Sequence, residues 1–86
     1  MVEVFITDIQ YAIQAERILN TIQTENLELK INYDLNETEF PFPCGHTILR
    51  IEGNKINSDK IMETVRNQGF NCEILEDKIC TQSGHL

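Results

Sequence analysis

The side chains best suited to chemistry are those of Cys44 and His46, which a single glycine separates. A thiolate and an imidazole are good ligands for Zn(II), Cu(I) and Cu(II), and the glycine permits a tight turn between them. Two side chains do not complete a site, so a third ligand would have to come from Asp8, Glu37, Glu39 or a second molecule. The sequence thus gives Cys44 and His46 as candidate metal ligands, supported by Asp8, with Cu(I) or Zn(II) as the metal. In the alternative, both side chains lie on an exposed loop and bind nothing.

The same two residues could be considered as a nucleophile and its base. That chemistry needs a hydrogen bond between imidazole and thiol, a group that orients the imidazole, and an oxyanion hole. Adjacency in sequence supplies none of these, so we expect no enzymatic activity and name no catalytic residue.

Two aromatic residues, Phe40 and Phe42, alternate with prolines just before Cys44. Aromatic side chains held on a stiff loop could dock in a groove of a partner protein. They could equally fold back over the open end of a small core, which needs apolar area. The sequence leaves both possibilities open, and it gives Phe40 and Phe42 as candidate partner-binding residues.

The first 35 residues predict a strand, a helix and a second strand. Residues 2–7 alternate with the period of a half-buried strand. Residues 7–10 have the form of a capping box, with Asp8 as an alternative N-cap, so a helix should begin here and end near residues 24–26. Residues 27–35 then alternate between apolar and polar side chains, which predicts an amphipathic strand at the edge of a sheet.

The second half of the chain repeats this order after a long connection. Residues 36–46 contain two prolines and a glycine, which predict a loop. Residues 47–51 alternate as a third strand. Asn57 is a suitable helix cap and Gly69 a suitable helix stop, and residues 70–75 have the apolar content of a fourth strand.

The order β-α-β-β-α-β predicts a ferredoxin-like α+β sandwich. Its antiparallel four-stranded sheet should have the strand order 4-1-3-2, with two helices on one face. We expect residues 1–79 to form this domain and residues 80–86 to form a C-terminal tail, which contains Cys80 and His85.

Four short motifs spread over residues 2–75 occur together in a known family. They are Ile18 with Ile22, the triplet Tyr33-Asp34-Leu35, the triplet Ile51-Glu52-Gly53, and the set Ile61, Val65, Gly69 and Phe70. In this respect the chain resembles the heavy-metal-associated (HMA) domain of copper chaperones and metal-transport ATPases. The resemblance implies the ferredoxin-like fold, a bound soft metal ion, and a metal-transport protein or another protein as partner.

The chain departs from that family at the metal site. The family binds Cu(I) through a CxxC motif at the start of its first helix, where the positive helix terminus lowers the thiol pKa. The two cysteine positions fall here on Tyr11 and Gln14, which are not soft ligands. One hypothesis is therefore metal binding or transfer through the loop of Cys44 and His46. The other is a metal-free protein-interaction or regulatory module on the same fold, for which Phe40 and Phe42 would matter and Cys44 would not.

Composition limits the partners and the cellular location that we expect for the domain. Fourteen acidic and seven basic residues give a net charge of −7, which repels nucleic acid and anionic membranes and suits a basic partner. No apolar run approaches the roughly 18 residues of a membrane span, and the N-terminus has no basic region, so we expect a soluble, cytoplasmic monomer or weak dimer. Three irregularly spaced cysteines predict reduced thiols, with Cys72 in the core.

Overall fold

The computed structural model describes residues 1–75 of the chain. The predicted boundary at residue 79, the predicted tail and its Cys80 and His85 lie outside the described residues. The elements are β1 (Val2–Thr7), α1 (Ala12–Glu25), β2 (Lys30–Asp34), β3 (Thr47–Glu52), α2 (Ser58–Asn67) and β4 (Cys72–Ile74).

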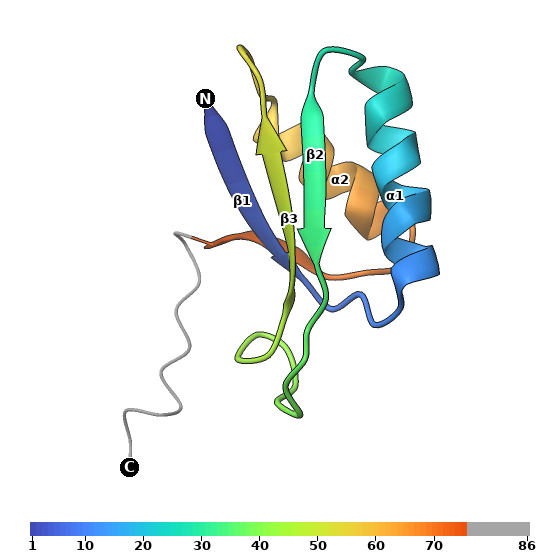
Figure 1. The fold of residues 1–86 in the computed structure, drawn as a ribbon, viewed down its shortest axis with the longest axis vertical. Helices are drawn as coiled ribbons and strands as arrows, with labels where there is room; N and C mark the ends of the chain where they lie inside the picture. Colours follow the sequence, from blue (N-terminus) through green and yellow to red (C-terminus); the bar gives the residue numbers. More distant parts are fainter. Residues whose placement is uncertain (76–86) are drawn as a thin grey trace.

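The four strands form one antiparallel sheet in the order β2-β3-β1-β4. Figure 1 shows both helices on the same face of this sheet. The predicted α+β ferredoxin-like arrangement is therefore confirmed, since 4-1-3-2 is the same order counted from the other edge.

The core lies between the helices and the covered face of the sheet. Phe5 of β1 is opposite Leu49 of β3, and both side chains are fully buried. Helix α1 contributes Ala15, Ile18 and Ile22 to this core, and all three are buried. Among residues 1–75, neither helix is long and apolar enough to cross a bilayer.

Helix α1 begins later than the sequence predicts. Its N-cap is Tyr11, so the prediction of a capping box at residues 7–10, with Asp8 as an alternative N-cap, is wrong. Thr7 belongs to β1, where its hydroxyl donates to the carbonyl of Thr47 at 3.1 Å. The side-chain Oε1 of Gln14 accepts the backbone N–H groups of Gln10 and Tyr11 at 3.3 and 3.2 Å, and these contacts close the first turn.

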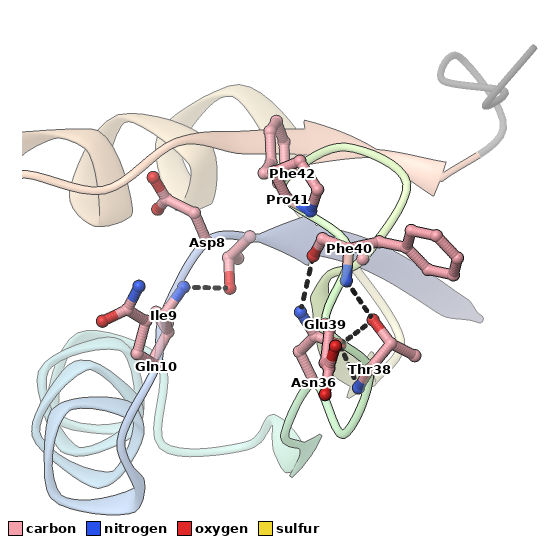
Figure 2. Close-up of a pocket in the computed structure, with 11 residues that line it drawn as sticks. Asp8, Ile9, Gln10, Asn36, Thr38, Glu39, Phe40, Pro41 and Phe42 are labelled. Atoms are coloured by element: carbon pink, nitrogen blue, oxygen red, sulfur yellow. Dashed lines mark hydrogen bonds between the residues drawn. The ribbon is translucent and has the colours of Figure 1, made fainter. Parts of the chain in front are cut away.

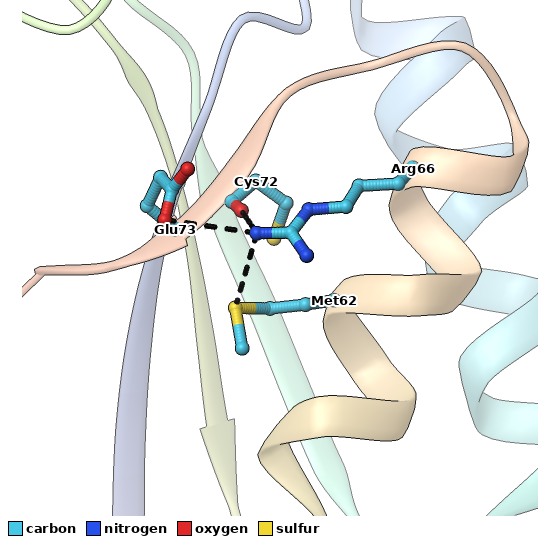
Figure 3. A network of polar contacts seen from close by, with 4 residues as sticks. All are labelled: Met62, Arg66, Cys72 and Glu73. Atoms are coloured by element: carbon cyan, nitrogen blue, oxygen red, sulfur yellow. Dashed lines mark hydrogen bonds and ion pairs between the residues drawn. The ribbon is translucent and has the colours of Figure 1, made fainter.

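Helix α2 follows the sequence closely. Asn57 is the N-cap, and its side chain accepts a backbone N–H of the first turn at 3.2 Å. Gly69 has a φ of +96°, the left-handed conformation that ends a helix at low cost. Arg66 links α2 to β4. Its guanidinium donates to the backbone carbonyl of Cys72 at 2.8 Å and forms an ion pair with the carboxylate of Glu73 at 3.6 Å (Figure 3).

Two strands are shorter than their sequence patterns. β2 begins at Lys30 rather than residue 27, and β4 is confined to Cys72–Ile74. The register explains β2, because Lys30 pairs with Glu52 and β3 ends there. Leu27, whose spacing matches the strand, is left 81 % exposed in the connection that precedes it.

Candidate functional site

Three connections meet at one end of the sheet, as the predicted topology requires. They are residues 8–11 after β1, residues 35–46 between β2 and β3, and residues 68–71 between α2 and β4 (Figure 1). The register brings them together, because Thr7 at the end of β1 pairs with Thr47 on one side and with Cys72 on the other. We call this part of the molecule the loop end.

Two fully buried threonines fix the first two of these loops to each other. Thr7 donates its hydroxyl to the carbonyl of Thr47 and accepts the N–H of Ile9 at 3.3 Å. Thr47 donates its hydroxyl to the carbonyl of Ile9 at 2.6 Å and accepts the N–H of Asn36 at 3.0 Å. Both loops are thereby held at their bases by side chains that no solvent reaches.

Asp8 connects the first loop to the third. Its Oδ1 accepts the backbone N–H of Asn71 at 2.8 Å, and its Oδ2 accepts the Asn71 side-chain amide at 2.7 Å. Sequence reasoning gave Asp8 as a supporting metal ligand and missed Asn71 altogether. The signal that could have found Asn71 is the topology, because this strand order places the connections after β1 and before β4 at the same end of the sheet.

The loop of residues 36–46 is braced by its own hydrogen bonds. The Oδ1 of Asn36 accepts the backbone N–H and the hydroxyl of Thr38 at 2.8 and 2.7 Å. The hydroxyl of Thr38 in turn accepts the N–H of Phe40 at 3.2 Å. Gly45 donates its N–H to the carbonyl of Pro41 at 2.9 Å, which closes the tip. The loop therefore has a defined conformation without a partner.

The two loop aromatics have different environments. Phe40 is 63 % exposed, whereas Phe42, which precedes a cis proline bond, is half-buried. The ring of Phe40 points away from residues 8–10 and toward solvent (Figure 2). Phe40 thus does not cap the core. Two further large side chains near this end, Tyr11 and Ile13, are 61 % and 66 % exposed.

A cavity of about 320 Å³ separates residues 7–10 from the loop of residues 36–45 (Figure 2). Its lining residues include the acidic Asp8 and Glu39, the amides Gln10 and Asn36, and the segment Phe40–Phe42. No lysine, arginine or histidine lines it among residues 1–75. The cavity is therefore chemically suited to a positively charged or hydrogen-bond-donating group.

Cys44 and His46 lie at the base of the loop and do not line the cavity. The Nδ1 of His46 is 2.9 Å from the carbonyl oxygen of Pro43, which can only accept, so Nδ1 is the donor in this contact. Within residues 1–75, no three His, Cys, Asp or Glu side chains are grouped to hold a metal ion.

The two cysteines within the described residues differ in oxidation state. Cys44 is disulfide-bonded, so the prediction that all three cysteines are reduced is wrong for this residue. The fold, rather than sequence spacing, decides which sulfurs meet. Cys72 is a free thiol buried in the core, as predicted, and burial raises its pKa to about 12. A disulfide sulfur is not a thiolate, so the predicted metal site requires Cys44 to be reduced.

No protein-family model, no curated protein and no solved structure matches this chain. The likeness to HMA domains consequently rests on the four sequence motifs and on the expectation of fold that came with them.

Proposed function

We propose that this domain is a protein-interaction module and that the loop end is its binding surface. The observation that carries the proposal is the 63 % exposed ring of Phe40, presented by a hydrogen-bonded loop beside a cavity. Aromatic side chains supply much of the binding energy at interfaces, especially where a pocket adjoins them. A loop that is ordered before binding also loses less conformational entropy when the partner arrives.

Tyr11 and Ile13 extend the same surface. Tyr11 caps α1 and Ile13 lies in its first turn, so α1 holds both side chains near the loop end. Exposed side chains of this size are ordinary when scattered, whereas several at one end of a small domain suit an interaction site. A partner that covers Phe40 and this part of α1 would bury all three.

Site-specific photo-cross-linking tests the proposal in the cells that produce the protein. A photoreactive phenylalanine analogue replaces Phe40 in one variant and Leu27 in the other. Leu27 is the matched control, because it is even more exposed but lies in the connection between α1 and β2, at the opposite end of the sheet (Figure 1). We expect a defined adduct from position 40 and none from position 27. The same adduct from both positions, or an adduct from position 27 alone, would contradict the proposal.

A second candidate function is metal binding or transfer by the reduced protein through Cys44 and His46. It is favoured by the contact of His46 Nδ1 with a backbone carbonyl, since metal-ligating histidines usually orient their free nitrogen in this way. Cu(I) or Zn(II) suits these donors, and the resemblance to HMA domains implies a metal-transport partner. A cytoplasmic location belongs to this proposal, because a reducing compartment would keep Cys44 as a thiol.

Metal titration of the reduced, isotopically labelled chain tests this second function. Zn(II) and Cu(I) should each produce saturable NMR shifts near Asp8, Cys44, His46 and Gly69 that are absent from the Cys44→Ala variant. Unchanged spectra at stoichiometric metal would eliminate this function, and they would leave the interaction surface unaffected.

A further inference from the structure

Charge is unequally distributed between the two ends of the sheet. The three connections of the loop end contain Asp8, Glu37 and Glu39 and no lysine or arginine. At the opposite end, Glu28 and Glu52 are offset by Lys30 and Lys55, and the carbonyl of Met1 accepts the N–H of Gly53 there, which places the N-terminal amine nearby. A basic segment would therefore be attracted to the loop end and less so to the other.

The residues that line the cavity of the loop end suit one kind of side chain. We propose that it receives an arginine of the partner, an inference that rests on the proposed interaction function. The guanidinium group has several N–H donors in a planar fork, and two acidic residues, Asp8 and Glu39, line the cavity from different loops. Phe42, which is half-buried and lines the cavity, provides aromatic surface on which such a plane can stack.

Asp8 keeps capacity for this contact although it already binds Asn71. Each carboxylate oxygen accepts one hydrogen bond from Asn71 and has a further lone pair. The Asn71 contacts also hold the carboxylate in place, so an arriving guanidinium would meet a positioned acceptor. The volume of about 320 Å³ is at the small end of the roughly 300–1,000 Å³ of ligand pockets, which suits a single side chain.

Three blocked peptides provide the probe: acetyl-Gly-Phe-X-Phe-Gly-amide with X as arginine, lysine or citrulline. Citrulline has nearly the shape of arginine without its charge. We titrate each peptide into the labelled full chain and follow the backbone amides by NMR. The arginine peptide should shift the amides of residues 8–10 and 36–45 saturably, and the lysine and citrulline peptides should bind at least about tenfold more weakly.

Two variants test which carboxylate contributes to binding of the arginine peptide. Glu39→Gln should weaken the arginine peptide several-fold, whereas Glu28→Gln, a matched removal of an exposed carboxylate at the opposite end, should not. Equal binding of the citrulline or lysine peptide, an unaffected Glu39→Gln variant, or no shifts at the loop end would each overturn the arginine assignment. A cross-link from position 40 together with any of these results would leave the interaction surface standing, so the two failures are distinguishable.

Discussion

Gly45 shows at the level of one residue how tightly the loop end is built. A Cβ atom at this position would meet the carbonyl oxygen of Phe40 and the side chains of Thr38 and Asn36. Because a backbone atom is among the obstacles, Gly45→Ala should displace the loop and cost about 1–3 kcal/mol of unfolding free energy. Urea denaturation, together with the amide shifts of residues 36–46, measures both effects.

Gly53→Ala is the control for this substitution. A Cβ there would meet at close range only the end of the Leu29 side chain and no backbone atom, so a smaller loss of stability is expected. If the two alanine variants lost the same stability and the loop amides did not move, the tight construction inferred at Gly45 would be refuted.

Cys72 gives a pH dependence whose sign follows from its burial. Burial raises the pKa of its thiol from 9.0 to about 12, so between these values the unfolded chain loses the proton and the folded chain retains it. The folded state then binds more protons, and the free energy of unfolding falls as pH rises from about 9 toward 12. The stability difference between wild type and Cys72→Ala should therefore shrink between about pH 8 and pH 10.5 in urea denaturation. A constant difference would show that Cys72 does not titrate in this way.

At the level of elements, the contact between Asp8 and Asn71 joins the connection after β1 to the connection before β4. Asp8→Ala removes two hydrogen bonds to a carboxylate. We expect a loss of about 1–2 kcal/mol, less than for a buried site because the contact is exposed, and faster hydrogen exchange of the Asn71 amide. Asp34→Ala on the edge strand β2 removes an exposed carboxylate and should change stability by less than about 0.5 kcal/mol. Unaltered exchange at Asn71 in Asp8→Ala would contradict this role.

Local patterns predicted the order of the elements but not all of their limits. Helix α2 was predictable because Asn57 and Gly69 act within its own first and last turns. The start of α1 was not, because Thr7 is held in β1 by Thr47, which is 40 residues away in sequence. The same holds for β2, which begins at Lys30 because its pairing partner Glu52 is the last residue of β3. Tertiary pairing overrides the local signal in both cases.

The candidate site was predictable to a similar extent. The topology correctly placed residues 8–11, 35–46 and 68–71 at one end of the sheet. It could not decide whether Phe40 faces the core or solvent, since either orientation satisfies a loop with alternating aromatics and prolines. Nor could spacing reveal that Cys44 is disulfide-bonded, because that depends on which sulfur the folded chain brings near.

At the scale of the whole molecule, the core and the loop end contain different kinds of residue. The covered face and the helices form the core, and the loop end combines exposed Phe40 with a cavity that carboxylates line. A net charge of −7 adds long-range attraction for a basic partner, so association should slow as salt screens it. Most residues that stabilise the fold are thus distinct from those that the proposed interaction would use, and Asp8 belongs to both groups.

The most direct measurement is the affinity of a purified, cross-link-identified partner for wild type, Phe40→Ala and Leu27→Ala by calorimetry. If Phe40 anchors the interface, its removal should cost about 2 kcal/mol or more, which is about a 30-fold rise in Kd. Leu27→Ala should leave Kd within about twofold, because that side chain lies at the opposite end. An unchanged Kd for Phe40→Ala would contradict the assignment of the loop end as the binding surface.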